Sequence, residues 1–225
     1  MTVELLDVEG TIGPVTFVRD VLFPLARARL GDFLRRAHAE DEAAWVADAA
    51  LEAGVAADDA AGLERALRAW MDADRKLGPL KAIQGRIWRD AYAAGELAAP
   101  LYADAVAALR AWRSAGRRVA IYSSGSEEAV RLYLRHSDAG NLEDHVEACF
   151  DTRVGPKVDP ASYVRVAERL GVAPSGIRFW TDSPGEVAAA SEAGLGTRWV
   201  VRGPVPAGAG PRVDRIDADP DAPGT

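Results

Sequence analysis

The sequence predicts an α/β fold: a mainly parallel sheet with helices on both faces, into which a helical segment is inserted. Short apolar segments that end in polar residues alternate with segments that carry apolar residues every three or four positions. An alanine-rich stretch with the same helical spacing, at about residues 26–111, follows the first apolar segment. A chain of 225 residues is long enough for a core domain with an insertion.

The expected strands are short and apolar, and three of them end in polar side chains that are useful in catalysis. Asp7 follows the first, Ser123 and Ser124 follow the second, and Asp182 follows the third. In a parallel sheet these residues meet at the edge formed by the carboxyl ends, where ligands bind. We expect strands at residues 3–6, 118–122, 177–181 and 198–201.

The expected helices follow from apolar spacing and from residues that start or break helices. Asp58 and Asp59 precede one helical pattern and predict its N-terminus, and Gly78-Pro79 separates that helix from the next. Further helices are expected at about residues 80–94, 104–113, 126–136, 160–170 and 184–193.

These patterns divide the chain into three parts. Residues 1–14 and 99–202 form the α/β core, and residues 15–98 form the helical insertion. Residues 203–225 are rich in Gly, Pro, Asp and Ala and are expected to form a tail that buries little surface. The exceptions are three apolar side chains that are able to dock: Val205, Val213 and Ile216.

Charge and cysteine content exclude several classes of protein. The 34 acidic residues outnumber the 27 basic ones, giving a net charge of −7, so nucleic acid and anionic membranes are not expected partners. Cys149 is the single cysteine, which excludes an intrachain disulfide and predicts a small buried side chain. Because there is neither an apolar run of about 18 residues nor a signal peptide, we expect a cytoplasmic protein. We separately expect a monomer.

The first candidate motif for catalysis is Asp7-Val8-Glu9-Gly10-Thr11, at the end of the first strand. An aspartate can attack phosphorus and form an acyl phosphate, and a second carboxylate can protonate the leaving oxygen and then activate water. Alternatively, the segment is a solvated turn with ordinary acidic residues. A second acidic cluster begins at Asp182, where carboxylate oxygens suit Mg²⁺, although an aspartate here also fits a helix N-cap.

Two further motifs suit a phosphate group. Ser123 and Ser124 precede a helix, where hydroxyl and N–H groups bind anions, although a plain serine cap explains them as well. Lys157 follows Gly155-Pro156, and a lysine held in a tight turn can neutralise a phosphoryl group. The alternative for Lys157 is an ordinary surface lysine.

In this order, the four motifs resemble those of the haloacid-dehalogenase superfamily of phosphotransferases, so a Rossmann-like core with an inserted helical cap is implied. Further stretches are similar to the enolase-phosphatases of the methionine salvage pathway, and Glu9 in place of a second aspartate is characteristic of them. The similarity runs from residue 3 to about 202. The stretches are residues 17–24, 81–88, 122–126, 136–140 and 150–157.

The resemblance implies a Mg²⁺-dependent phosphoric monoester hydrolase that first enolises a small diketone phosphate and then dephosphorylates it to an acireductone. One Mg²⁺ is implied per active site, held by Asp7, Asp182 and the backbone carbonyl of Glu9. Asp7 is the implied nucleophile, and the side chain of Glu9 is the implied acid and base. Ser123, Ser124 and Lys157 would bind the phosphate. In the cap, we expect Gln84, together with Lys81 and Trp88, near the substrate.

The sequence departs from the resembled pattern in two places. The resembled pattern usually continues after Thr11 with Thr and Ser residues, whereas this chain reads Ile12-Gly13-Pro14-Val15-Thr16. Gly185 and Ala188 replace acidic residues that often follow Asp182. Three alternatives therefore stay open: another Mg²⁺-dependent capped phosphatase acting on a different small phosphomonoester, a dehalogenase-type hydrolase, and a binding module without catalysis. Glu9 argues against the dehalogenase, which needs no acid at this position.

Overall fold

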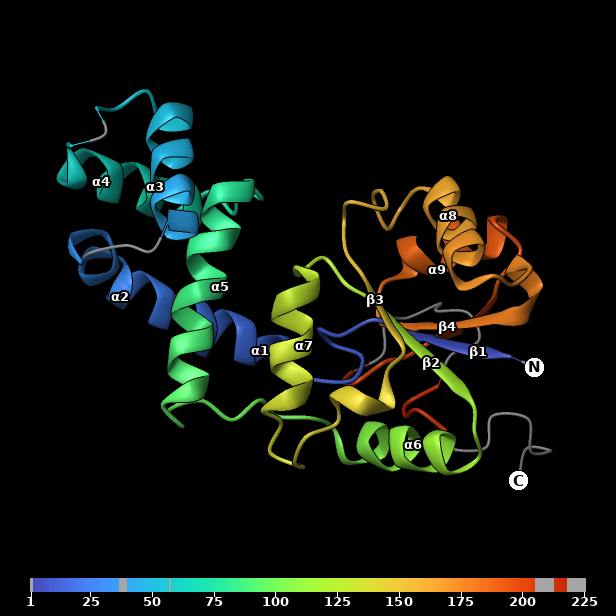
Figure 1. Ribbon diagram of the computed structural model, residues 1–225. Helices are drawn as coiled ribbons and strands as arrows, with labels where there is room; N and C mark the ends of the chain where they lie inside the picture. The colour runs from blue at the N-terminus through green and yellow to red at the C-terminus, as the bar shows by residue number, and fades with distance from the viewer. Residues whose placement is uncertain (1, 37–39, 57, 205–212, 218–225) are drawn as a thin grey trace. The chain divides into compact units, whose positions relative to one another are not determined.

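The computed structural model describes residues 2–36, 40–56, 58–204 and 213–217. The chain forms two compact units, one comprising Met1–Val15 with Ala98–Thr225 and the other comprising Thr16–Leu97. The first unit is the α/β core, and the second is helical over its described residues (Figure 1). No helix in the described part of the chain is long and apolar enough to cross a membrane.

A parallel sheet of five strands, in the order β3-β2-β1-β4-β5, forms the centre of the first unit. The expected strands at residues 3–6, 118–122 and 177–181 are confirmed, and the fourth lies two residues earlier than expected. Strand β3 was not expected, because three residues are too few for a recognisable pattern. The strands are β1 (Val3–Leu6), β2 (Arg118–Tyr122), β3 (Ala148–Phe150), β4 (Ile177–Thr181) and β5 (Gly196–Trp199).

The helices of the first unit begin at capping residues that the sequence supplies. Ser126 accepts a hydrogen bond from the backbone N–H of Ala129 at the start of α7, and Asp159 does the same for Ala161 at the start of α8. The helices are α6 (Ala103–Ser114), α7 (Glu127–Arg135), α8 (Pro160–Leu170) and α9 (Pro184–Glu192), with 3₁₀ turns at Glu143–His145 and Pro174–Gly176.

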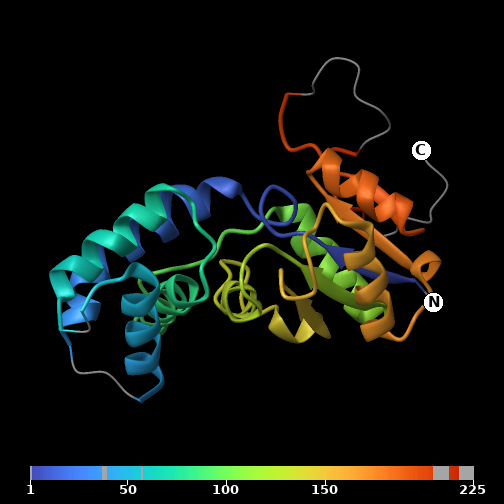
Figure 2. The same ribbon diagram turned by 90° about the horizontal axis from the view of Figure 1, so that it is seen from above.

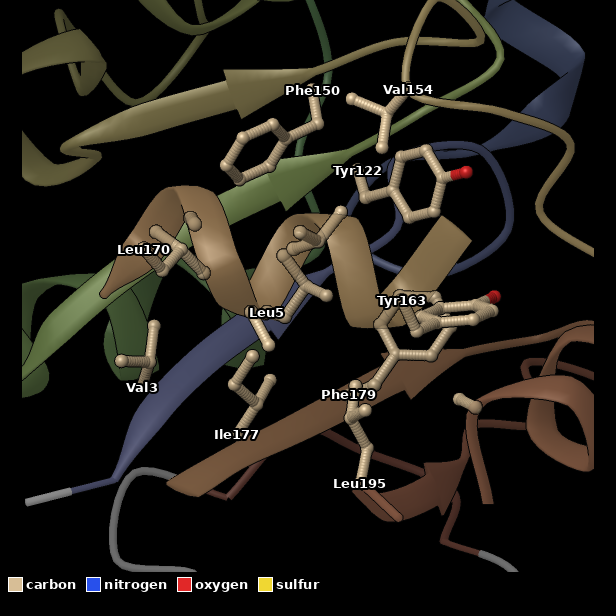
Figure 3. Close-up of a cluster of buried hydrophobic side chains, with 14 of the residues drawn as sticks. Val3, Leu5, Tyr122, Phe150, Val154, Tyr163, Leu170, Ile177, Phe179 and Leu195 are labelled. Carbon is tan, nitrogen blue, oxygen red and sulfur yellow. The ribbon is translucent and has the colours of Figure 1, made fainter. Parts of the chain in front are cut away.

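Both faces of the sheet are covered, which explains why its strands are apolar without alternation. Figure 1 shows α8 and α9 on one face and α6 on the other. Tyr163 of α8 is fully buried, with its ring centre 5.5 Å from that of Tyr122 and 5.2 Å from that of Phe179 (Figure 3). On the opposite face, Trp112 of α6 packs against Trp180 of β4 with ring centres 6.0 Å apart.

The second unit consists of helices, seen in blue to green in Figure 2. The expected N-cap is confirmed at Asp59, which accepts a hydrogen bond of 2.7 Å from the backbone N–H of Gly62. Trp88 donates a 2.8 Å hydrogen bond from Nε1 to the carbonyl of Leu22 and so joins two segments of this unit. The elements are α1 (Val15–Phe17), a π-helical turn (Val18–Leu22), α2 (Phe23–Arg35), α3 (Glu40–Ala53), α4 (Ala60–Asp72) and α5 (Gly78–Ala93).

Residues 213–217, within the expected tail, pack against other parts of the first unit. Val213 forms a parallel bridge with Val200: its N–H donates a 2.8 Å hydrogen bond to the carbonyl of Trp199, and its carbonyl accepts one of 2.9 Å from the N–H of Val201. Ile216 is buried. The expectation that Val213 and Ile216 dock is therefore confirmed, whereas Val205 lies outside the described residues.

Candidate active site

Asp7 stands where the central strand of the sheet ends. Its backbone N–H donates a 2.9 Å hydrogen bond to the carbonyl of Trp180 in the neighbouring strand, which continues the pairing by one residue. The side chain is buried, so it is not part of a solvated turn. The position follows from parallel pairing, because β1 and β4 end at the same edge of the sheet.

Lys157 lies directly against Asp7. Its Nζ is 2.5 Å from Oδ1 of Asp7 and 2.8 Å from Oε2 of Glu186, and the side chain is buried. Burial lowers the pKa of the lysine, but the charges of Asp7 and Glu186 outweigh burial and raise the pKa above its usual value. Lys157 therefore stays charged, and the surface-lysine alternative is wrong.

The turn before Lys157 explains how a lysine reaches so deep into the site. Gly155 has φ +145°, and a Cβ there would lie 2.2 Å from Oγ of Ser162, so this position requires glycine. Two buried tyrosines hold the turn: Tyr122 donates a 2.8 Å hydrogen bond to the carbonyl of Gly155, and Tyr163 donates one of 2.6 Å to the carbonyl of Lys157.

Glu9 faces the second strand end. Oγ of Ser123 donates a 3.2 Å hydrogen bond to Oε2 of Glu9, while the backbone N–H of Gly125 donates one of 3.0 Å to the same hydroxyl. Burial, followed by the negative charge of Asp7, raises the pKa of Glu9. A glutamate that holds its proton more strongly than usual suits a general acid.

Asp182 follows β4 and packs against the loop after Asp7. A Cβ at Gly10, which has φ +77°, would lie 2.1 Å from Oδ2 of Asp182, so only glycine fits beside this carboxylate. The backbone N–H of Asp182 donates a 3.0 Å hydrogen bond to Oγ1 of Thr11. Desolvation and then the charge of Asp7 raise the pKa of Asp182 to about 6. The N-cap of α9 is Ser183, so the N-cap alternative for Asp182 is wrong.

Glu186 is a site residue that was not assigned a role from the sequence. It lies in the first turn of α9, accepts a 2.7 Å hydrogen bond from Oγ1 of Thr181, and contacts Lys157. Burial and the charge of Asp7 raise its pKa. Its distance of four residues from Asp182, across a strand-to-helix turn, was the available signal, because such a turn brings both carboxylates to one edge.

The other predicted residues have different surroundings. Ser124 is exposed beside the buried Ser123, and the serine that caps α7 is Ser126. Gln84 lies in α5 of the second unit, where its side chain is buried. Cys149 is buried in β3, as expected, and burial raises the pKa of its thiol to about 11.

Comparison with known proteins gives the family. The chain is 51% identical to enolase-phosphatase E1 of Parvibaculum lavamentivorans, over 84% of this chain and 81% of that protein. It is 50% identical to enolase-phosphatase E1 of Acidiphilium cryptum, over 88% of this chain and 84% of that protein. The chain belongs to the enolase-phosphatase E1 family. Residues 4–194 also match the model of the haloacid dehalogenase-like hydrolases.

The solved structures agree with this fold. The UTR4 protein of Saccharomyces cerevisiae superposes with a TM-score of 0.82 at 27% identity, covering 96% of this chain and 98% of that one. A dehalogenase with an intermediate complex superposes with a TM-score of 0.54 at 21% identity, covering 92% and 87% of the two chains, which shows the fold alone.

In this member of the enolase-phosphatase E1 family, a cation at the site would meet Asp7 and Asp182. Within residues 2–36, 40–56, 58–204 and 213–217, no three side chains of His, Cys, Asp or Glu are grouped so as to hold a metal. The two carboxylates offer hard oxygen ligands, and the side chain of Glu9 is turned to Ser123. A metal held here would therefore depend on these two side chains, backbone oxygens, water and substrate.

Proposed function

We propose that this protein is the bifunctional enolase-phosphatase of methionine salvage. It enolises 2,3-diketo-5-methylthiopentyl-1-phosphate to 2-hydroxy-3-keto-5-methylthiopentenyl-1-phosphate. It then hydrolyses the product to phosphate and the acireductone 1,2-dihydroxy-3-keto-5-methylthiopentene. Family membership supports this activity. The observation that carries the chemistry is the 2.5 Å contact between Lys157 and Asp7, because a buried lysine beside an aspartate suits phosphoryl transfer to a carboxylate.

In the phosphatase step, Asp7 attacks phosphorus in line with the departing oxygen. The positive charge of Lys157 stabilises the phosphoryl oxygens, and Ser123, Ser124 and nearby N–H groups bind them. Glu9 gives its proton to the leaving oxygen, which releases the enol. The Glu9 carboxylate then takes a proton from the water that attacks the acyl phosphate, so phosphate leaves and Asp7 is regenerated.

In the enolase step, a base removes a proton from the carbon that bears the phosphate ester. We assign this base to Glu9, since its carboxylate lies beside Asp7 at the sheet edge and Ser123 fixes its direction. Glu9 takes the carbon-bound proton and passes it to the carbonyl oxygen at C2, which gives the 2-hydroxy enol. A proton from solvent then restores the acid form of Glu9 before it protonates the leaving oxygen. Burial and the charge of Asp7 raise the pKa of Glu9, which makes its carboxylate a stronger base.

We assign Mg²⁺, one ion per site, to Asp7, Asp182 and the backbone carbonyl of Glu9. The donors are hard oxygens, and the charge of Asp7 raises the pKa of Asp182, so a cation would relieve the repulsion between them. When bound, Mg²⁺ supplies positive charge that offsets the charges of Asp7 and the phosphate dianion.

The insertion, residues 15–98 in the expected division, is assigned as a cap that shields the reaction from water. Gln84, in the buried part of α5, is its first candidate for a contact with the substrate. We further assign the protein to the cytoplasm, as a monomer that binds neither nucleic acid nor membranes. Sedimentation of the purified chain tests the monomer.

An assay with the diketone phosphate, followed by ultraviolet absorbance and by phosphate release, tests the proposal. Both the enol and the acireductone are expected in Mg²⁺, and phosphate release is expected to stop when a chelator is added. Release of phosphate from unrelated esters alone would favour another capped phosphatase. Activity that is insensitive to the chelator would favour a dehalogenase-type hydrolase.

A further inference from the structure

Arg202, three residues after β5, connects three segments of the first unit that are far apart in the sequence. Its side chain is 14% exposed. The guanidinium donates hydrogen bonds of 3.2 Å from Nε and 2.7 Å from Nη2 to the carbonyl of Thr11. Nη1 donates one of 2.7 Å to Oδ2 of Asp104. The proposed mechanism gives this arginine no task.

Thr11 is the link between Arg202 and the site. The threonine is fully buried, and its Oγ1 accepts the 3.0 Å hydrogen bond from the backbone N–H of Asp182. Gly10, the preceding residue, is the one whose missing side chain makes room for the Asp182 carboxylate. Arg202 therefore fixes a carbonyl in the loop that follows Asp7, while the side chain of the same threonine fixes Asp182.

The C-terminal segment, defined as Val213–Asp217, holds the arginine from the other side. The backbone N–H of Ile216 donates a 2.6 Å hydrogen bond to Oδ2 of Asp104, the oxygen that also receives Nη1 of Arg202. Nη1 also donates a 3.4 Å hydrogen bond to the carbonyl of Asp214. Burial of Ile216 and the backbone pairing of Val213 attach the segment to the unit.

The residue that precedes α6, Tyr102, also contacts Arg202. The guanidinium carbon of Arg202 lies 4.3 Å from the ring centre of Tyr102, close enough for a cation–π contact. The backbone N–H of Tyr102 donates a 2.9 Å hydrogen bond to the carbonyl of Ile12, the residue after Thr11. The planar guanidinium thus lies against a ring and donates hydrogen bonds to three different acceptors, an arrangement that lysine cannot reproduce.

We propose that Arg202, locked by the C-terminal segment, is a positioning residue that holds the loop from Asp7 to Thr11, and with it Asp182, in the arrangement needed for turnover. The proposal rests on the proposed function of that site. A small displacement of reacting groups lowers turnover more than substrate binding. We call Arg202, together with its hydrogen bonds to Thr11, Asp104 and the C-terminal segment, the clamp. Its loss is therefore expected to lower kcat with little change in KM.

Three variants test the clamp. Arg202→Ala removes it, Arg202→Lys keeps the charge without the two-sided geometry, and a chain ending at Gly203 keeps Arg202 but lacks the C-terminal segment. The matched control is Arg118→Ala. Arg118 also bonds one carboxylate, that of Glu147, and one carbonyl, that of Leu170, but it begins β2 at the opposite end of the sheet.

We expect Arg202→Ala to lower kcat by about tenfold or more with KM within twofold. Added guanidinium ion should restore part of kcat, and the shortened chain should show a smaller loss in the same direction. Arg118→Ala should lower the melting temperature and leave kcat unchanged. If Arg202→Ala does not fold, Arg202→Lys and the shortened chain supply the kcat and KM values.

Two results would overturn the proposal: unchanged kcat in the folded Arg202 variants and the shortened chain, or an equal loss of kcat in Arg118→Ala. The measurement is made on the diketone phosphate and on p-nitrophenyl phosphate. If the wild-type protein hydrolyses p-nitrophenyl phosphate but not the diketone phosphate, the proposed substrate is contradicted. The effect of Arg202 on kcat is then measured with p-nitrophenyl phosphate.

Discussion

The two ends of β1 each bury a carboxylate, and their surroundings are opposite. Near the start of the strand, Glu4 is fully buried and accepts hydrogen bonds from two arginines and a tryptophan: 3.1 Å from Arg178, 3.4 Å from Arg117 and 2.8 Å from Nε1 of Trp180. At the carboxyl end, Asp7 shares one cation, Lys157, with Glu186.

The difference lies in the balance of charge. Two arginines surround one carboxylate at Glu4, so the negative charge is fully compensated. At the other end, Glu9, Asp182 and Glu186 all have a raised pKa, and the charge of Asp7 contributes to each shift. The charges around Glu4 are balanced within the fold, whereas the carboxylates around Asp7 accumulate negative charge that a bound cation would neutralise.

The largest effect is expected from removal of the nucleophile. Asp7→Asn keeps the shape of the side chain, but an amide does not form an acyl phosphate, so phosphate release should fall by a factor on the order of 10⁴. The check is a phosphate assay on the purified variant in Mg²⁺, with circular dichroism to establish that it is folded. Appreciable turnover would refute the assignment of Asp7.

Substitution of Glu4, whose charge is compensated by two arginines, should lower stability and leave catalysis unchanged. Glu4→Gln removes the buried negative charge that Arg117 and Arg178 share, and the free energy of unfolding should fall by about 3 kcal/mol. Urea unfolding measures this. The control is Glu147→Gln, in a partly exposed pair with Arg118, where a loss of about 1 kcal/mol or less is expected. A fall in kcat of the folded Glu4→Gln variant would show that the two ends are not independent.

Among the carboxylates around Asp7, removal of a charge should raise stability instead of lowering it. Because the pKa of Asp182 is about 6 in the folded protein against 3.8 ordinarily, its ionisation opposes folding as the pH rises through this interval. Without metal, Asp182→Asn should therefore stabilise the protein above pH 6, by about 1 kcal/mol given the exposure of the side chain. The gain should vanish below the ordinary pKa. Thermal unfolding in chelator at several pH values measures it, and destabilisation at pH 8 would contradict the account.

The smallest effect concerns Cys149, which belongs to neither cluster. With a pKa of about 11, its thiol is ionised to roughly one part in a thousand at pH 8, so alkylation by iodoacetamide should be slow. The same reaction in urea should be fast, because the pKa returns to its ordinary value. Rapid alkylation of the folded protein would show that β3 opens readily.

The sheet edge could be predicted from the sequence because each of its residues follows a strand directly. The positions of Asp7 and Asp182 follow from those of β1 and β4, because parallel pairing brings the carboxyl ends of the two strands to the same edge. The depth of Lys157 was not predictable, since it depends on Tyr122 and Tyr163 holding the turn from two different elements.

Contacts between residues that lie far apart in the sequence were equally unpredictable. Glu4 meets partners 113 and 174 residues away, and nothing in Val3-Glu4-Leu5-Leu6 distinguishes a buried glutamate from an exposed one. Arg202 reaches Thr11 across 191 residues. Strand β3 was missed for a different reason: it has three residues and is recognisable only by its pairing with β2.

Calorimetric titration of Mg²⁺ into the wild-type protein, Asp7→Asn and Glu4→Gln at pH 7.5 tests the contrast between the two ends most directly. The account predicts one binding site in the wild-type protein and in Glu4→Gln, and none in Asp7→Asn. Equal binding by Asp7→Asn, or no binding by the wild-type protein, would contradict it.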